Sequence, residues 1–283
     1  MIEQIRRIII SKLGFLMEDK STVSGYFFGK EIRDGVYYAE AETKGRENIL
    51  LDNVPKEYLE NRYYKITCSN VDFIDSLILN KEMLISSDLS KKQDDISMTQ
   101  TERNFLYNFV KRISPRKIME FSPFRGFSTI TISQALDKNN IDFFETHELE
   151  KENANLTQFN LYENDIDFVK VNVGDVFETL DREKLKEVDF LMIDSDHSGK
   201  FAERYIKEFF PLLKDGCWVA IHDISYDEYF SSEERKAVCD YLQSINSKTH
   251  FHIADLMKIY QIIDDTFMYS NQRNTLLFYQ VKK

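Results

Sequence analysis

The sequence contains few cysteines and few glycines, and the cysteines form no metal-binding or disulfide pattern. Its 283 residues include 3 cysteines and 9 glycines. Cys68, Cys217 and Cys239 lie far apart and form no CxxC pair, which argues against a zinc cluster and against a disulfide framework. This cysteine usage is typical of a reducing compartment, so we expect a cytoplasmic protein.

Long hydrophobic segments are also missing from the N-terminus. The longest uninterrupted aliphatic run there is Ile8–Ile10, too short for a signal-peptide core or a membrane span. Five apolar residues recur at helical spacing instead: Ile2, Ile5, Ile9, Leu13 and Leu16. They predict an amphipathic helix that packs on the protein or on a second copy in a homodimer. We expect no membrane association.

Positive charge is in deficit. The 37 Lys and Arg residues against 48 Asp and Glu residues give a formal net charge of −11, and the pI is near 5.1. A phosphate lattice would be repelled by this field unless a local basic patch overcame it. We therefore expect a small-molecule or carbohydrate ligand and no nucleic acid.

The sequence pattern changes near residue 98, from irregular to regularly alternating segments. Residues 1–98 mix short aromatic runs with turn residues and predict a small α+β region that covers the substrate or supports oligomerisation. The polar segment 86–102 is typical of a linker or a mobile lid. Thr101 is the predicted cap of a helix that ends near Ile113.

Residues 99–283 alternate between strand-like and helix-like segments. Seven strands are predicted within KIMEFS, IDFFETHE, DFVKVNV, VDFLMID, CWVAIHD, THFHIADLMKIY and NTLLFYQVK. This alternation predicts an α/β fold with a Rossmann-like, doubly wound, mostly parallel seven-stranded sheet and helices on both faces. The last two strands lack a clear helix between them, which favours an antiparallel edge strand.

Polar side chains gather at the predicted carboxyl ends of the strands, where ligands bind in such sheets. They are Glu120, Ser122, His147, Glu148, Asp175, Asp194, Asp196, His197, His222 and Asp223. Asp196 is equally well explained as a turn residue that caps the next helix. His250 and His252 lie two apart on a predicted edge strand, where surface histidines are common.

The loop after the first strand, EFSPFRGFST at residues 120–129, combines one glycine with an acid. A pyrophosphate-binding loop uses G-x-G-x-x-G for close backbone approach and avoids a carboxylate beside the phosphates. Here Gly126 stands alone and Glu120 ends the strand. S-adenosylmethionine has no phosphates and carries an ammonium and a sulfonium, so an acid attracts it. The loop therefore favours this cofactor over a nicotinamide dinucleotide.

Five motifs together resemble the class I S-adenosylmethionine-dependent methyltransferases. They are EFSPFRGFST, HELE, VNVGDV, IDSDHSG and LLKDGCWVAIHDI, in the expected order at five successive strands. The branch that they resemble is that of macrocin-type sugar O-methyltransferases and cephalosporin-hydroxylase-like proteins. The resemblance covers roughly two thirds of the chain and does not extend to the first hundred residues.

The resemblance implies a cofactor site built on the strand ends. The first loop would contribute Glu120, Ser122, Gly126 and Ser128, the first three at the methionine end. Glu148 would accept hydrogens from both ribose hydroxyls, with Glu145 and Glu150 as rivals, and Asp175 and Val176 would lie by the adenine. Ser122 departs from the family pattern, because that position is usually glycine.

His197 is the candidate general base. Methyl transfer to oxygen requires alignment and removal of the acceptor's proton. His197 follows the strand that carries Asp194, and an ordinary histidine has a pKa near ~6.5. The alternative is a helix-capping or core histidine.

A divalent ion is a further expectation from the fourth and fifth strands. Asp194 and Asp223 end neighbouring strands and could hold magnesium against the substrate hydroxyl, as related O-methyltransferases often do. His222 stands where metal-dependent relatives tend to have another acid, and histidine suits transition metals better. Without a metal, His222 could share base duty or hold the substrate, and Asp194 could approach the cofactor's ammonium.

The predicted function is O-methylation of a hydroxyl on a small molecule or glycan precursor. A non-catalytic cofactor-binding or assembly protein with the same fold is the alternative from another class. A nicotinamide-dependent oxidoreductase is disfavoured by the lone glycine and by Glu120. Residues 225–235 and the N-terminal region are expected to shape the acceptor pocket.

Overall fold

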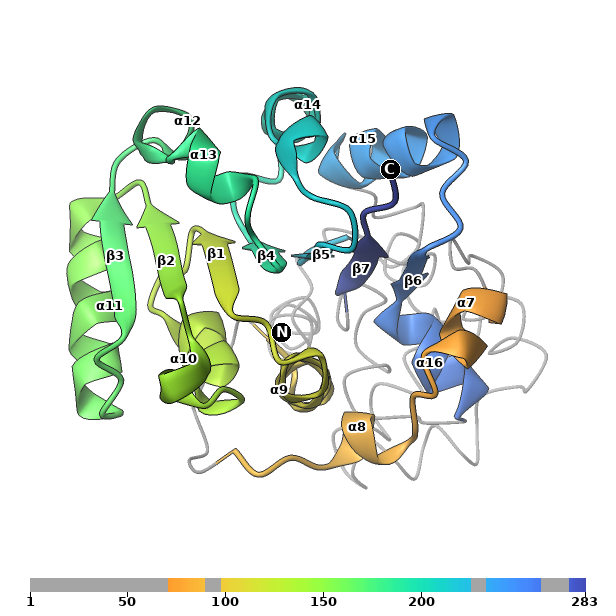
Figure 1. The fold of residues 1–283 in the computed structure, drawn as a ribbon, viewed down its shortest axis with the longest axis horizontal. Helices are drawn as coiled ribbons and strands as arrows, with labels where there is room; N and C mark the ends of the chain where they lie inside the picture. The colour runs from red at the N-terminus through yellow and green to blue at the C-terminus, as the bar shows by residue number, and fades with distance from the viewer. Residues whose placement is uncertain (1–70, 90–97, 225–232, 261–274) are drawn as a thin grey trace, which may run out of the picture.

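The computed structural model describes residues 71–89, 98–224, 233–260 and 275–283 (Figure 1). A seven-stranded sheet in the order β3-β2-β1-β4-β5-β7-β6 forms its centre. The strands are β1 Lys117–Phe121, β2 Phe143–Glu148, β3 Val169–Val173, β4 Phe190–Ile193, β5 Trp218–Ile221, β6 His250–His252 and β7 Leu277–Gln280. Strands β1 to β5 pair in parallel, and β7 is antiparallel to both of its neighbours. The predicted fold class is confirmed, and the antiparallel strand lies between β5 and the edge strand β6.

Helices cover both faces of this sheet (Figure 1). Packed with one face are α7 Val71–Ser76, α8 Glu82–Ile85, α9 Gln100–Ile113, α10 Phe127–Gln134 and α16 Ile253–Ile259. The other face carries α12 Val176–Thr179, α13 Arg182–Leu185, α14 Gly199–Glu208, the short 3₁₀ turn η2 Phe210–Leu212 and α15 Glu233–Ser244. Helix α11 Lys151–Glu163 packs along β2 and β3, and a second 3₁₀ turn, η1 Lys138–Asn140, precedes β2.

Strands β4 and β5 are apolar throughout because both of their faces are covered. In β4, Phe190 and Met192 belong to the core under α9, while Leu191 and Ile193 belong to the core under α14. All four side chains are fully buried. A continuous apolar run is what a doubly covered parallel strand requires, and it explains why these segments were readable as strands.

The cap of helix α9 lies two residues before the predicted Thr101. The cap is Thr99, whose Oγ1 accepts the Glu102 N–H at 3.1 Å, while Glu102 Oε2 accepts the Thr99 N–H at 2.7 Å. The T-x-x-E spacing that closes such a capping box occurs at Thr99 and not at Thr101. Thr101 is buried inside the helix.

Part of the N-terminal region packs on the sheet. Ile74 of α7 and Leu84 of α8 are buried in the same core as Phe109 of α9. The Asn108 side chain ties α9 to the chain after α8 by donating to the Ser86 carbonyl at 2.7 Å. The predicted amphipathic helix at the N-terminus lies outside the described residues, as do residues 90–97 of the polar segment 86–102. The domain boundary at residue 98 stays a prediction.

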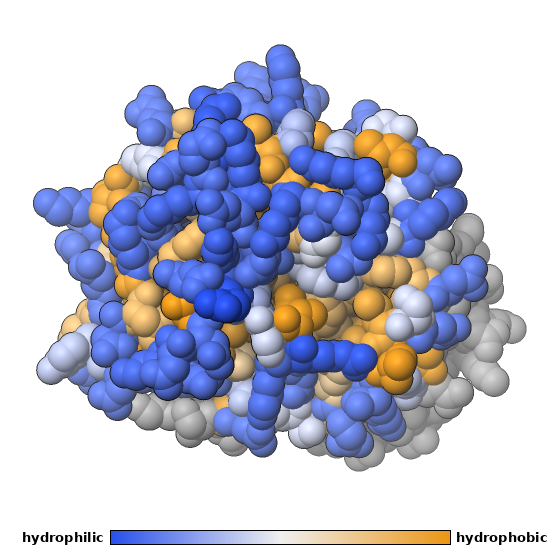
Figure 2. All heavy atoms as spheres, viewed as in Figure 1, coloured by the Kyte–Doolittle hydropathy of each residue, from blue (hydrophilic) through white to orange (hydrophobic). Residues whose placement is uncertain are grey.

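Polar and charged residues cover much of the face seen in Figure 2, with smaller apolar areas between them. Among the described helices, none is both long and apolar enough to cross a membrane.

The order of the strands defines where a ligand fits. The chain runs outward from β1 to β2 and β3, then returns to the other side of β1 with β4 and β5. The winding direction therefore reverses between β1 and β4. Side-chain and loop atoms beyond the carboxyl ends of these two strands border a crevice, which is the usual ligand site in such sheets.

Candidate active site

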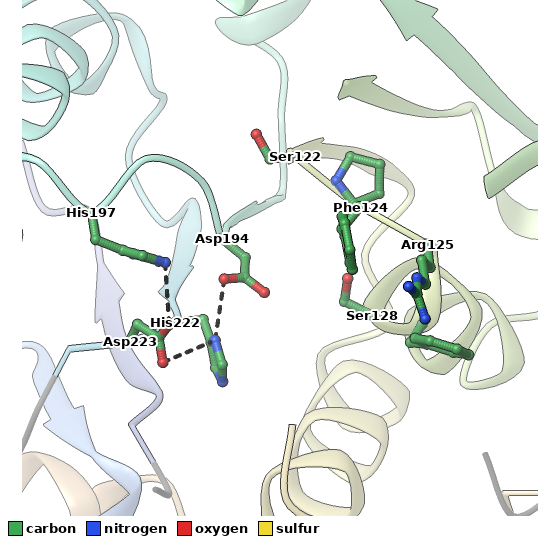
Figure 3. A pocket seen from close by; sticks show the side chains of 10 residues that line it. Ser122, Phe124, Arg125, Ser128, Asp194, His197, His222 and Asp223 are labelled. Atoms are coloured by element: carbon green, nitrogen blue, oxygen red, sulfur yellow. Dashed lines mark hydrogen bonds and ion pairs between the residues drawn. The ribbon is translucent and has the colours of Figure 1, made fainter. Parts of the chain in front are cut away.

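Two adjoining cavities occupy this crevice. The first, which we call the acid–histidine cavity, has a volume of about 410 Å³ and is lined by Ser122, Pro123, Phe124, Arg125, Phe127, Ser128, Asp194, His197, His222 and Asp223 (Figure 3). The second, the aromatic cavity, has a volume of about 400 Å³ and is lined by Ser122, His147, Leu149, Gly174, Asp175, Val176, Phe177, Ser195, Asp196, Ser198, Lys200, Phe201 and Arg204. Ser122 borders both, so one elongated ligand can extend from one to the other.

The loop between β1 and α10 has an unusual backbone. Ser122, Phe124 and Gly126 all adopt positive φ, at 56°, 53° and 81°. Such values are uncommon for residues with a side chain, and the family's preference for glycine at the Ser122 position follows from them. A Cβ at Gly126 would lie 3.0 Å from the Thr157 Cγ2 atom, so this position also lacks room for a side chain. Strain of this kind concentrates at functional sites.

Glu120 does not reach either cavity. Its side chain is fully buried under the loop, where Oε1 accepts the Ser128 hydroxyl at 2.6 Å and Oε2 accepts the Thr129 hydroxyl at 2.5 Å. Burial raises the pKa of Glu120 to about 7, against the opposing effect of these hydrogen bonds. The charge that the sequence analysis placed at the loop is therefore weak near neutral pH, and Asp194 and Asp223 supply the acids of the cavity instead.

Glu148 supports the same loop from the end of β2. Its Oε2 accepts the Phe124 N–H at 3.0 Å and its Oε1 accepts the Glu150 N–H at 3.1 Å. A carboxylate offers about four acceptor positions, so two further bonds are available to ribose hydroxyls. The rival Glu145 is committed to Lys184 and to Lys170 instead. The ribose role of Glu148 stays a prediction.

Asp175 and Val176 lie where the resemblance implies, beside the aromatic cavity. Asp175 begins α12 by accepting the Phe177 N–H at 2.9 Å. The Arg204 guanidinium lies 3.7 Å from the centre of the Phe177 ring. His147 lines the same cavity, and burial lowers its pKa to about 4, which keeps its ring neutral. An apolar slot with a few polar groups suits an aromatic base.

His197 lies between two carboxylates at the other end of the crevice. Its Nε2 is 3.1 Å from Asp223 Oδ2, which borders the acid–histidine cavity (Figure 3). Its Nδ1 is 2.9 Å from Glu234 Oε2. The hydrogen bond with Glu234 raises the pKa of His197, helped by the charges of Asp223 and Asp194 and opposed by burial.

The buried His222 ring is surrounded by three carboxylates. Its Nδ1 lies 3.2 Å from Asp194 Oδ1 and 3.5 Å from Asp223 Oδ1, and its Nε2 lies 3.5 Å from Glu102 Oε1. Burial alone would lower the pKa of His222, but these three carboxylates hold it well above its ordinary value. Burial likewise opposes ionisation of Asp194, yet the charge of His222 keeps the pKa of Asp194 low. The two side chains therefore form an ion pair.

The sequence analysis missed two acids that hold the histidines. Glu102 belongs to the capping box of α9, so its T-x-x-E signal was present, but nothing in the sequence shows that it reaches His222. Glu234 lies in the first turn of α15, 37 residues from His197. Contacts of this range depend on tertiary packing and leave no local pattern.

Three predicted residues could hold a divalent cation. Asp194, His197 and Asp223 each offer one ligand atom, and these atoms lie within 4.8 Å of one another. The sequence analysis paired the two aspartates, and the structure adds His197 to them. Two carboxylates with an imidazole suit a transition metal better than magnesium, which prefers oxygen ligands. The residues present therefore fit a cation of that class.

Asp196 and the two histidines of β6 make hydrogen bonds that support the fold. The Asp196 Oδ1 accepts the Ser198 N–H at 3.0 Å, and Ser198 itself caps α14. His250 and His252 are buried rather than exposed on the surface. His252 Nε2 bonds the Ile224 carbonyl at 2.8 Å, and helices α7 and α16 contact β6.

Comparison with known proteins agrees with this geometry. Residues 123–224 match the family model described as a methyltransferase domain. This part of the chain therefore resembles a methyltransferase domain. The matched range contains residues 123–129 of the first loop, all residues that line the aromatic cavity except Ser122, and the Asp194–His197 and His222–Asp223 segments. A search of curated proteins found no match.

Solved methyltransferases with related folds are distant. An O-methyltransferase from Bacillus cereus in complex with SAH is 18% identical, with a TM-score of 0.44, and the alignment covers 65% of this chain and 87% of that chain. The O-methyltransferase TomG from Streptomyces achromogenes in complex with SAM is 19% identical, with a TM-score of 0.46 and coverage of 64% and 86%.

The buried Glu120 predicts a distinct pH dependence of stability. Because its folded-state pKa of about 7 exceeds the ordinary 4.5, its stabilising contribution is complete below pH 4.5 and is lost as the pH rises through 7. Glu120→Gln should therefore gain stability relative to the wild type between pH 5 and pH 8, by up to about 3 kcal/mol. Urea unfolding at both pH values measures this difference. Glu152→Gln on exposed α11 is the control, and an equal pH response of both variants would contradict the assignment.

Proposed function

We propose that this methyltransferase transfers the methyl group of S-adenosylmethionine to a hydroxyl of a small molecule or sugar precursor, with His197 as general base. The observation that carries the proposal is the shared border at Ser122 between a slot suited to adenine and a cavity containing an imidazole. A donor lying across this border would point its sulfonium at the acid–histidine cavity, where Asp194 and Asp223 attract positive charge.

The cofactor's binding residues follow from the same geometry. The adenine would occupy the aromatic cavity beside Val176 and Phe177. The ribose would meet Glu148, which is 4% exposed and lies between the cavity-lining residues His147 and Leu149. The methionine end would lie along the loop at Ser122 and Ser128, with its ammonium directed to Asp194. When bound, the cofactor supplies a methyl carbon already activated by positive sulfur. The protein's task is alignment and proton removal.

Proton removal is assigned to the Nε2 atom of His197. In the acceptor complex, the neutral His197 ring keeps its hydrogen on Nδ1 and exchanges the contact of Nε2 with Asp223 for the acceptor hydroxyl. Nε2 then takes the hydroxyl proton as oxygen attacks the methyl carbon. The carbon–sulfur bond breaks, and the products are a methyl ether and S-adenosylhomocysteine. The neighbouring carboxylates of Asp223 and Glu234 stabilise the imidazolium that forms.

A divalent cation, if loaded, would be held by Asp194 and Asp223 with His197 as third donor. It would supply Lewis-acid stabilisation of the developing alkoxide. Because a metal-bound Nε2 cannot accept a proton, base catalysis and metal ligation by His197 are mutually exclusive.

Cofactor binding provides the first test. We expect S-adenosylhomocysteine to bind in calorimetry and NAD not to bind, and Glu148→Ala to weaken the affinity about tenfold or more by removing charged hydrogen bonds. The adjacent Glu150→Ala is the matched control, because the Glu150 side chain makes no capping bond to α11. Binding of NAD in place of the sulfur compound would overturn the proposal, and equal effects of the two substitutions would remove Glu148 from the ribose role.

Turnover provides the second test. S-adenosylhomocysteine release is measured with a panel of phenols, catechols, and free and nucleotide-linked sugars. His197→Asn should lower turnover about 10²- to 10⁴-fold, because it removes the base, while affinity for S-adenosylhomocysteine stays within about twofold. A wild-type rate in the variant would assign proton removal elsewhere. Tight cofactor binding without transfer to any acceptor would favour a non-catalytic binding protein.

Metal preference provides the third test. Chelator-treated protein should bind zinc or manganese more tightly than magnesium, and His197→Asn should weaken zinc binding far more than magnesium binding. Zinc should also lower turnover, since it competes for Nε2. Activation by zinc with loss in the His197→Asn variant would make His197 a metal ligand in the reaction rather than its base.

A further inference from the structure

We propose that Glu234, oriented by Tyr205, is a positioning residue that fixes the tautomer of His197 and leaves its Nε2 lone pair free for the acid–histidine cavity. The importance of this for catalysis rests on the proposed function. The tautomer itself is a property of the protein alone and can be measured without any substrate.

Both oxygens of the Glu234 carboxylate have a defined partner. Oε2 lies 2.9 Å from His197 Nδ1, and Oε1 accepts the Tyr205 hydroxyl at 3.0 Å. Glu234 is 1% exposed and Tyr205 is fully buried. An ionised carboxylate only accepts hydrogen bonds, so Nδ1 must carry the hydrogen. Nε2 faces the Asp223 carboxylate at 3.1 Å in the same way, so the charged ring donates from both nitrogens. When the ring loses one hydrogen, the lone pair is on Nε2, because the Asp223 side chain is 44% exposed and can turn away, whereas the Glu234 side chain is 1% exposed and is held by Tyr205.

The backbone holds the same two residues together. The Glu234 N–H donates to the His197 carbonyl at 3.3 Å, and the neighbouring Glu233 accepts the Gly199 N–H through Oε2 at 3.2 Å. A Cβ at Gly199 would lie 3.0 Å from the Glu233 Cβ atom, so the start of α15 lies directly against the His197 loop. Glu234 therefore fixes both the main chain and the ring of His197.

The hydrogen bond from Tyr205 fixes which oxygen of Glu234 faces His197, and a substitution can test this. Its phenol is a donor to Oε1, so in Glu234→Gln the amide oxygen is expected to take that place and the amide nitrogen to face His197. The amide N–H would then donate to Nδ1, and the ring hydrogen would move to Nε2. An equivalent exchange in serine proteases, aspartate to asparagine, lowers turnover about 10⁴-fold through the wrong tautomer.

The decisive experiment is nitrogen NMR of the full chain labelled with ¹⁵N-histidine, at a pH high enough for a neutral His197 ring. His197→Asn identifies the resonances. We expect hydrogen on Nδ1 in the wild type and on Nε2 in Glu234→Gln. The matched control, Glu233→Gln, alters the adjacent acid that contacts Gly199 and should keep the wild-type tautomer.

A double variant separates positioning from general support of the fold. Phe at position 205 removes the phenol, so in Tyr205→Phe with Glu234→Gln the amide can rotate and accept the Nδ1 hydrogen again. We expect this double variant to recover the wild-type tautomer and at least about tenfold of the turnover lost in Glu234→Gln, with unchanged affinity for S-adenosylhomocysteine. A purely structural role predicts that the double variant is worse than either single one.

The outcomes that overturn the inference are specific. Hydrogen on Nε2 in the wild type, or an unchanged tautomer in Glu234→Gln, would refute it. If Glu234→Gln fails to fold, the wild-type tautomer and that of Tyr205→Phe still decide, because both should keep hydrogen on Nδ1. Absence of methyl transfer in the wild type with the expected tautomers would refute the proposed function and leave the role of Glu234 intact.

Discussion

The parallel pairing of β4 with β5 is the constraint on which the candidate site depends. Its register places Ile193 opposite Ile221, so the next residues, Asp194 and His222, leave the sheet side by side. The ladder continues one step further, because the His222 N–H donates to the Ile193 carbonyl at 2.9 Å. A slip of one residue would turn these side chains to the opposite faces of the sheet. The apolar, fully buried strands prevent such a slip, since it would also rearrange both cores.

Charge compensation then determines how many acids the crevice can contain. Asp194 and Glu102 are largely buried and would be costly as isolated charges. The His222 ring between them provides a positive partner for both, and Asp223 contacts both histidines. The residue before Asp223 at the end of β5 is thus a basic side chain. A positive His222 ring neutralises part of the carboxylate charge that a divalent cation would otherwise neutralise.

The sequence was sufficient for the strands and for the residues that follow them. Segments such as VDFLMID were predictable because a strand covered on both faces must be apolar, and the strand-end rule then located Asp194, His197, His222 and Asp223. The side that Glu120 faces was also implicit in the alternation of β1, whose Met119 and Phe121 join the core under α14. Glu120 was predicted to contact the cofactor from its charge and from the family resemblance, and neither takes this alternation into account.

Other features could not be inferred from local pattern. Glu102 and Glu234 reach the histidines from α9 and α15, and only the packing of those helices on the sheet brings them near. The left-handed backbone at Ser122 and Phe124 is equally hidden, because neither residue type signals positive φ. The sequence thus predicts which residues form the site, but it does not predict the distant residues that orient them.

Orientation matters more than basicity for the chemistry proposed here. The sulfonium already activates the methyl carbon, so the barrier depends mainly on alignment of donor and acceptor and on a base that faces the acceptor. An imidazole free to rotate or to change tautomer would present its lone pair to the cavity for only part of the time. The buried chain from Tyr205 through Glu234 to His197 removes that freedom before any ligand binds. Preorganisation of this kind costs nothing at the moment of reaction, which explains why two buried polar side chains are placed behind a half-exposed histidine.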